Sequence, residues 1–159
     1  MSDKRSAGLL LYRRTPDGGT EVLIGHMGGP FWAGRSTGAW SIPKGEYGPE
    51  EPPLDAAHRE FEEELGFPAP DGERVALGES RQANGKTVVV WAVEADLDPA
   101  RVVPGTFTME WPRGSGTLRE FPEIDRVGWF APEAAAPLLV AGQQTFLERL
   151  AEHLGGPGA

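Results

Sequence analysis

The stretch "LDAAHREFEEELGF", residues 54–67, decides the fold, because it combines a helical pattern of apolar residues with a dense group of like charges. Two prolines precede it, and Gly66 lies where a helix would end. We therefore expect a helix over Leu54–Leu65. Four glutamates fall within five positions of this helix: Glu60, Glu62, Glu63 and Glu64.

A helix of about 100° per residue sorts these side chains into stripes. The apolar stripe contains Leu54, Ala57, Phe61 and Leu65, and the neighbouring stripe contains Glu60, Glu63 and Glu64. Glutamates spaced three and four residues apart repel one another. Two interpretations follow: a solvated acidic face, or a site for a hard divalent cation such as Mg2+ or Mn2+. Zn2+ fits less well, because the chain has no cysteine.

The spacing around the helix resembles a known motif. Gly45 is followed after five residues by Glu51, and after seven more by the run from Arg59 to Phe67. This resembles the Nudix box, G-x5-E-x7-R-E-U-x-E-E-x-G-U with U apolar, and every defined position matches. The order of predicted strands and the C-terminal helix also resemble the Nudix hydrolase domain, so the likeness covers most of the chain.

The remaining pattern predicts one domain over residues 1–154, followed by a disordered tail over residues 155–159. Strands are expected at Ala7–Arg13, Glu21–His26, Arg74–Ser80, Thr87–Ala95 and Arg126–Phe130, with a further one within Arg101–Trp111. Besides the first helix, helices are expected at Gln143–Leu154 and, as a short one, at Ala134–Leu139. The mixed order favours an α+β domain, and the resemblance implies an α/β/α sandwich with a mixed sheet.

The charge of the chain restricts its partners. A formal net charge of −9 argues against a broad basic surface for nucleic acid or for an anionic membrane. No apolar run reaches the length of a membrane span, and the N-terminus lacks the pattern of a signal peptide. We therefore expect a cytoplasmic protein that acts on a small molecule.

The resemblance implies which residues bind metal. Glu60, Glu63, Glu64 and the backbone carbonyl of Gly45 would hold Mg2+ or Mn2+ against a diphosphate. Arg59 would orient these carboxylates. Glu51 would give structural support from before the helix, through the helix N-terminus or Arg59.

The general base has more than one candidate. In some Nudix hydrolases it is the glutamate that Glu60 matches here, and in others it lies outside the box. The segment "LREFPEIDRVGWF", residues 118–130, offers Glu123 and, as a second choice, Glu120. We favour Glu123 for its spacing of six residues before Trp129, which is similar to that in such family members. Either glutamate is alternatively an ordinary loop charge.

The substrate is expected to contact the loop that precedes the box. Lys44 and Arg35 are the cations nearest to it in sequence and would hold outer phosphates, with Arg81 and Lys86 as further candidates. Each is alternatively a plain solvated charge. Trp32 is the favoured aromatic for stacking on a base, with Phe31 beside it, whereas Trp40 is expected in the core.

The motif "PKG", residues 43–45, resembles the Nudix branch that cleaves dinucleoside polyphosphates and diphosphoinositol polyphosphates. The tyrosine usual downstream of the box in the dinucleoside group is missing. The motif thus favours dinucleoside polyphosphates, whereas the missing tyrosine argues against them. The expected substrates are dinucleoside polyphosphates or (deoxy)nucleoside triphosphates. ADP-ribose, nucleotide sugars and diphosphoinositol polyphosphates remain alternatives, as does a non-catalytic nucleotide sensor. A homodimer is also open, because Nudix domains often dimerise.

Overall fold

The computed structural model describes residues 4–82 and 85–155. Residues 156–159 of the predicted tail lie outside this range. The described residues contain nine strands: β1 (Arg5–Arg14), β2 (Thr20–Met27), β3 (Trp40–Ser41), β4 (Lys44–Tyr47), β5 (Val75–Arg81), β6 (Thr87–Glu94), β7 (Thr106–Glu110), β8 (Leu118–Pro122) and β9 (Ile124–Phe130). The α-helices are α1 (Pro53–Leu65), α2 (Pro132–Ala135) and α3 (Gln144–His153), with a 3-10 turn at Pro99–Arg101.

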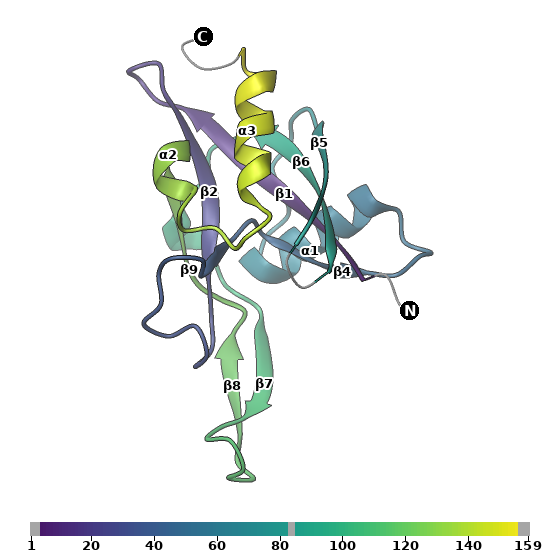
Figure 1. Cartoon of the computed structure of the whole chain (residues 1–159), viewed down its shortest axis with the longest axis vertical. Helices are drawn as coiled ribbons and strands as arrows, with labels where there is room; N and C mark the ends of the chain where they lie inside the picture. Colours follow the sequence, from purple (N-terminus) through teal and green to yellow (C-terminus); the bar gives the residue numbers. More distant parts are fainter. Residues whose placement is uncertain (1–3, 83–84, 156–159) are drawn as a thin grey trace.

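Seven strands form one mixed sheet (Figure 1). Its main order is β3-β2-β1-β6-β5, with β4 paired to β1 and β9 paired to β2. Strands β1 and β6 run parallel over eight residue pairs, and the other pairings in this sheet are antiparallel. The central strand β1 is therefore bordered by β2, β4 and β6, and it carries the core on both of its faces.

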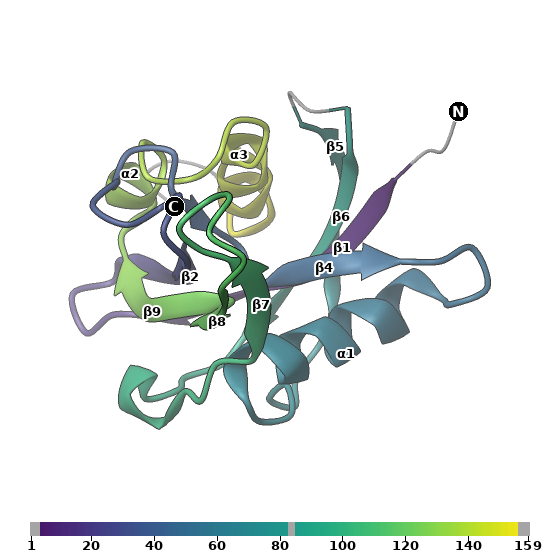
Figure 2. The same ribbon diagram turned by 90° about the horizontal axis from the view of Figure 1, so that it is seen from below.

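Helices cover both faces of the sheet, with α1 on one side and α2 and α3 on the other (Figure 2). Alternate residues of β1 separate the two cores, because successive strand side chains point to opposite faces. Leu9 and Leu11 belong to the cluster that includes Phe61 of α1, whereas Leu10 belongs to the cluster that includes Phe146 of α3. The predicted α/β/α sandwich with a mixed sheet is confirmed.

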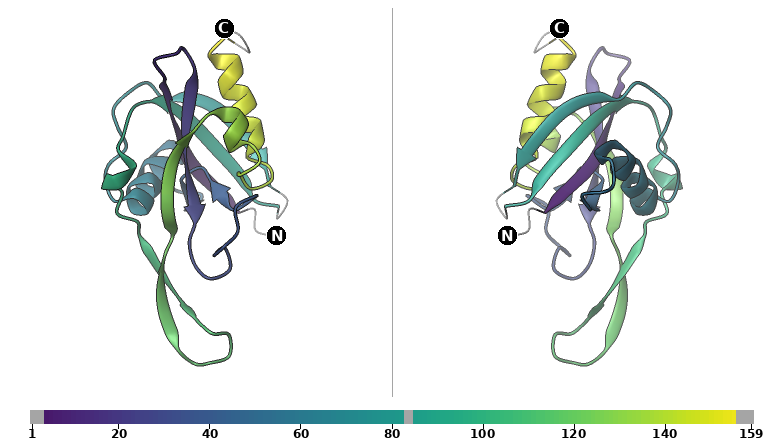
Figure 3. Two further views of the ribbon diagram at one scale, coloured as in Figure 1. Left: turned by 90° about the vertical axis from the view of Figure 1, so that its left-hand side faces the viewer. Right: turned by 90° about the vertical axis from the view of Figure 1, so that its right-hand side faces the viewer.

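Strands β7 and β8 form a separate two-stranded hairpin that extends away from the sandwich (Figures 1 and 3). One backbone hydrogen bond closes the base of the hairpin, and a second joins that base to the residue after β2. Glu123 N–H donates to the Gly105 carbonyl at 2.8 Å, and Gly28 N–H donates to the Glu123 carbonyl at 3.0 Å. These bonds bring the start of the hairpin beside the end of β2.

The main elements lie where the sequence pattern predicted them, and the differences are local. The predicted strand within Arg101–Trp111 is shorter, because its first residue belongs to the 3-10 turn and β7 begins at Thr106. The predicted helix Ala134–Leu139 was wrong in its bounds: α2 occupies Pro132–Ala135. Pro137 has no backbone N–H to donate, so it does not continue the helical hydrogen-bond pattern.

None of the helices in the described ranges combines the length and apolar character of a membrane span.

Candidate active site

The motif of residues 45–67 folds as strand β4, which belongs to the sheet, then a loop, and then helix α1, which covers one face of the sheet. Strand β4 is fixed by antiparallel pairing with β1, in which Gly45 lies opposite Ala7. Helix α1 is fixed by its apolar stripe, since Ala57, Phe61 and Leu65 are fully buried. Gly66 ends the helix in the left-handed conformation with φ of 85°, and its N–H donates to the Glu62 carbonyl.

The strand and the helix meet at Gly45 and Glu60. A Cβ atom on residue 45 would collide with the Glu60 carboxylate. Glycine at this position therefore lets the β4 backbone come close to the glutamate without displacing its carboxylate. Glu60 is 9% exposed, although its neighbours on the same stripe are more accessible.

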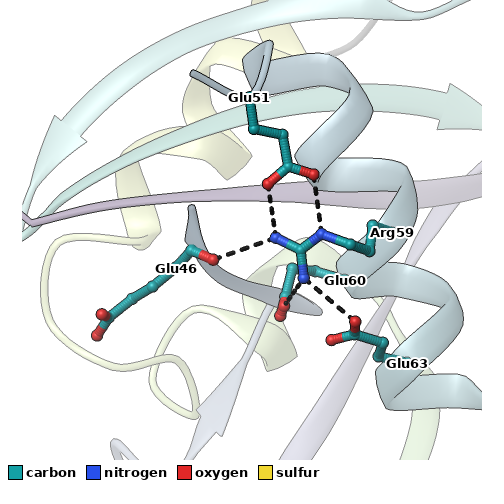
Figure 4. A network of polar contacts seen from close by, with 5 residues as sticks. All are labelled: Glu46, Glu51, Arg59, Glu60 and Glu63. Atoms are coloured by element: carbon teal, nitrogen blue, oxygen red, sulfur yellow. Dashed lines mark hydrogen bonds and ion pairs between the residues drawn. The ribbon is translucent and has the colours of Figure 1, made fainter. Parts of the chain in front are cut away.

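Arg59 hydrogen-bonds the side chains of three glutamates and the backbone carbonyl of a fourth (Figure 4). It forms a bidentate pair with Glu51, with both N–O distances at 2.8 Å. Its Nη1 also donates to Glu60 at 3.3 Å and to Glu63 at 3.2 Å, and its Nη2 donates to the Glu46 carbonyl. The network thus joins the segment before the helix, strand β4 and the acidic stripe.

Burial makes two carboxylates of this stripe unusually basic. Burial, and then the negative charge of Glu63, raises the pKa of Glu60 from 4.5 to about 7. Burial raises the pKa of Glu64 to about 8, although the nearby Lys44 ammonium opposes this rise. Burial also lowers the pKa of Lys44, against the charge of Glu64. Without a counter-ion, Glu60 and Glu64 therefore bind protons more readily near neutral pH than exposed glutamates do.

A cavity of about 570 Å³ is centred on these groups. The acidic stripe contributes Glu60, Glu63 and Glu64, and β4 contributes Lys44, Gly45 and Glu46. Glu123, from the segment between β8 and β9, completes the acidic wall. The structure thus brings together the predicted metal-binding residues, Lys44 and the favoured base, which lie up to 79 positions apart along the chain (123 − 44).

A second cavity of about 360 Å³ adjoins the first and shares Lys44, Glu64 and Glu123 with it. Its other walls are mostly apolar: Met27, Gly28, Trp32, Ser41, Phe107 and Ile124. Trp32, the favoured stacking residue, therefore borders a space that is continuous with the acidic cavity. Trp40 instead lies in the core at 5% exposure, as predicted.

Three other predicted residues line neither cavity. Arg35 places its guanidinium over the ring of Phe31, at 4.6 Å from the centroid. Arg81 is exposed at the end of β5. Glu120, the second choice for the base, accepts a hydrogen bond from the Thr106 hydroxyl at 3.1 Å within the hairpin.

Sequence reasoning missed the contribution of the β7–β8 hairpin. Gly105 and Thr106 line the acidic cavity and Phe107 lines the apolar one. A Cβ atom on Gly105 would lie 2.6 Å from the Glu63 carbonyl oxygen, and one on Gly29 would lie 2.8 Å from the Phe107 ring. In the sequence, only the two glycines indicated that another part of the chain could come close to these positions. The fold was needed to show that the hairpin and helix α1 are the parts that meet there.

The donor groups fit a hard divalent cation. Carboxylate oxygens and a backbone carbonyl are the ligands that Mg2+ and Mn2+ prefer. Within the described ranges, no three histidine or acidic side chains already have the spacing of a metal site. Arg59 explains part of this, because it holds the carboxylates of Glu60 and Glu63 itself. Burial is the main cause of the raised pKa values of Glu60 and Glu64, and a cation bound to these carboxylates would lower both values.

Comparisons with known proteins agree with this arrangement. A crystal structure of a C. elegans Ap4A hydrolase binary complex has a TM-score of 0.63 at 21% identity, covering 95% of this chain and 97% of that one. The Nudix hydrolase RenU from M. smegmatis has a TM-score of 0.57 at 26% identity, covering 94% and 84%. The NUDIX domain of Shewanella oneidensis NrtR, complexed with ADP ribose, has a TM-score of 0.61 at 15% identity, covering 97% and 90%.

No curated protein matches the chain. The family model of the NUDIX domain, however, matches residues 3–150, which is nearly the whole sequence. This match includes the strand–loop–helix motif, the sheet and most of α3. The chain therefore belongs to the Nudix family and is a Nudix hydrolase.

Proposed function

We propose that this protein is a divalent-metal-dependent pyrophosphohydrolase that cleaves a diphosphate linkage in a nucleotide derivative. One observation carries the proposal: Glu60, Glu63, Glu64, Gly45 and Glu123 line one cavity together with Lys44. A phosphoanhydride is anionic, so a purely acidic cavity would repel it. An acidic cavity suits this substrate when cations occupy it.

Glu60, Glu63, Glu64 and the Gly45 carbonyl would hold Mg2+ or Mn2+. A cation bound there supplies Lewis acidity, which offsets the charge of the diphosphate and makes a water molecule more acidic. The remaining tasks fall to the protein. Lys44 holds a phosphate oxygen by charge, and Arg59 fixes Glu60 and Glu63 through the pair it makes with Glu51.

Glu123 is the proposed general base. It is exposed, and its side chain borders both cavities. From this position its carboxylate accepts a proton from a water that attacks phosphorus, and the bond to the leaving phosphate then breaks. Positioning and charge stabilisation supply most of the rate enhancement in such reactions. Glu60 is the alternative base.

The adjoining cavity supports a nucleotide as substrate. Trp32 and Phe107 give it aromatic walls, and it meets the acidic cavity at Lys44. We propose dinucleoside polyphosphates or (deoxy)nucleoside triphosphates, whose base and phosphates match the apolar and acidic sides. The C. elegans relative is named as an Ap4A hydrolase, which favours the first class.

A second candidate is hydrolysis of ADP-ribose or a nucleotide sugar. It is favoured by the ADP ribose complex of the Shewanella oneidensis NrtR domain. We place this reaction second, because the "PKG" motif of residues 43–45 resembles the dinucleoside polyphosphate branch. For either substrate, we propose a cytoplasmic protein that needs neither nucleic acid nor membrane.

A substrate panel tests the proposal. Dinucleoside polyphosphates, (deoxy)nucleoside triphosphates, ADP-ribose and nucleotide sugars are incubated with the protein and Mg2+ or Mn2+, and the products are separated by chromatography. We expect metal-dependent cleavage that Glu64→Gln abolishes. Glu62→Gln is the matched control, because Glu62 is an exposed residue of the same helix that lines neither cavity. Nucleotide binding without any cleavage would instead indicate a non-catalytic sensor.

A further inference from the structure

A buried histidine contacts both β9 and the loop that carries Trp32, a residue of the apolar cavity wall. His26 lies near the end of β2 and is 2% exposed. Its Nδ1 is 2.8 Å from Oδ1 of Asp125 in β9, and its Nε2 is 2.6 Å from the backbone carbonyl oxygen of Arg35. Both ring nitrogens are therefore satisfied, as a buried polar group requires.

The identity of these two partners defines the protonation state of the ring. A carboxylate and a backbone carbonyl both accept hydrogen bonds, so both nitrogens of His26 must donate. A neutral imidazole has one donor, whereas the imidazolium cation has two. Both contacts can be hydrogen bonds to unprotonated acceptors at the same time only when the ring is doubly protonated.

The Asp125 carboxylate favours a cation at His26, whereas the guanidinium of Arg126, the cross-strand partner of His26, opposes one. Asp125 of β9 supplies the negative partner. The guanidinium of Arg126, also in β9, lies over the ring of Trp40, which makes an edge contact with His26. The guanidinium of Arg35 is directed to the ring of Phe31, so from the loop it is the Arg35 carbonyl that faces the histidine.

Residue 35 lies in the middle of the loop 28–39, which carries Trp32. Backbone hydrogen bonds hold the two ends of this loop, from Gly28 to Glu123 and from Gly38 to Pro137. Between them, His26 is the one group outside the loop that hydrogen-bonds residues 29–37 among the described residues. Gly29 and Gly34 have positive φ angles of 94° and 78°, a conformation that glycine adopts readily. The His26 contact therefore restrains a loop whose backbone has alternatives.

We propose that His26 is a positioning residue: as an imidazolium it ties the loop 28–39 to β9 and thereby holds Trp32 at the wall of the substrate cavity. Loss of one proton leaves a ring that can keep one of its two contacts. This tie, meaning the contacts of His26 with Asp125 and with the Arg35 carbonyl, does not depend on the proposed function. The inference that substrate affinity depends on the tie does rest on the proposed function. Without this tie substrate affinity falls, while the carboxylates at the reacting phosphates stay in place.

The ring itself gives the first test. Nitrogen-15 NMR of the histidine side chains near neutral pH, with His26 assigned from the spectrum of His26→Gln, shows whether one or both nitrogens carry protons. We expect protons on both Nδ1 and Nε2 of His26. A neutral tautomer would overturn the proposal.

Loop exchange gives a second test that needs no substrate. Backbone hydrogen exchange of residues 29–37 is expected to be about 10-fold faster in His26→Gln, which loses a charge-assisted hydrogen bond. His153→Gln is the matched control, since His153 is exposed at the end of α3. Equal exchange in the wild type and His26→Gln would contradict the tie.

Kinetics with Mg2+ and the best nucleotide of the panel give the third test. We expect KM to rise about 10-fold in His26→Gln while kcat changes less than about twofold. Asp125→Asn, which removes only the negative partner of His26, is expected to raise KM in the same direction and to leave kcat nearly unchanged. A fall in kcat as large as the rise in KM, or an unchanged KM in Asp125→Asn, would overturn the positioning role. If the ring and exchange results hold but no nucleotide is cleaved, the proposed function fails and the tie stands.

Discussion

Gly45 lies directly against the carboxylate of Glu60, with no room between them for a methyl group. The contact joins β4 to α1, and it brings the Gly45 backbone to the same cavity as the acidic stripe of the helix. A side chain at residue 45 would displace the glutamate that the proposed metal site needs.

The first prediction follows from this contact. Gly45→Ala is expected to reduce Mn2+ affinity and hydrolysis by about 10- to 100-fold, in the range seen when metal ligands are displaced by their surroundings. Gly48→Ala is the matched control, because a Cβ atom at residue 48 meets nothing within 4 Å. Calorimetric titration with Mn2+ measures the difference, and wild-type affinity in Gly45→Ala would refute the role of this contact.

Arg59 gives the second prediction. Lysine keeps the positive charge but cannot reproduce a bidentate pair with Glu51 while contacting Glu60 and Glu63. Arg59→Lys is expected to lower kcat by about 10- to 100-fold. The free energy of unfolding should fall by about 1 kcal/mol or less, because the guanidinium is 39% exposed and solvent screens its pairs. Unchanged kcat would show that Arg59 does not orient the carboxylates.

The third prediction separates the two glutamates near β8. Glu123 borders both cavities, whereas Glu120 is hydrogen-bonded to Thr106 in the hairpin. Glu123→Gln is expected to lower kcat by about 10²- to 10⁴-fold and to keep Mn2+ binding, since a general base contributes about this factor. Glu120→Gln should retain most activity. If Glu123→Gln also retains it, Glu60 becomes the better candidate for the base.

The fourth prediction concerns pH and stability. The folded pKa values of Glu60 and Glu64, about 7 and about 8, lie above the usual 4.5. The unfolded chain therefore loses these protons first, and the stability that these groups contribute is lost as the pH rises through 7 and 8. Thermal unfolding of the metal-free protein should occur at lower temperature at about pH 8 than at about pH 6.

Added Mg2+ should reverse this trend, because it favours the ionised carboxylates of the folded state. In Glu64→Gln the pH dependence should be weaker, since one of the two titrating groups is removed. A metal-free melting temperature that increases from about pH 6 to about pH 8 would contradict the raised pKa values.

Much of the sandwich could be predicted because its elements carry local patterns. The apolar stripe Leu54–Leu65 specifies α1, and the β-branched run of β6 specifies a strand. Strand β4 was missed, since "KGEY" has only four residues and becomes a strand by pairing with β1. Strand β8 was missed for a similar reason: "LREFP" ends in proline and pairs only with β7.

The sequence predicted the part of the candidate site that lies within one motif. Residues 45–64 supply half of the residues that line the acidic cavity, from a single strand–loop–helix segment. Phe107 and the tie between His26 and Asp125 depend instead on residues up to 99 positions apart. No local period or spacing indicates such contacts. The same limit applies to Arg35, whose guanidinium is directed to Phe31 rather than to either cavity.

Titration of the purified, folded protein with Mn2+ tests most directly whether the acidic stripe is a metal site. We expect saturable binding in the wild type and in Glu62→Gln, and its loss in Glu64→Gln. Absence of saturable binding in the folded wild type, or equal binding in Glu64→Gln, would contradict the account.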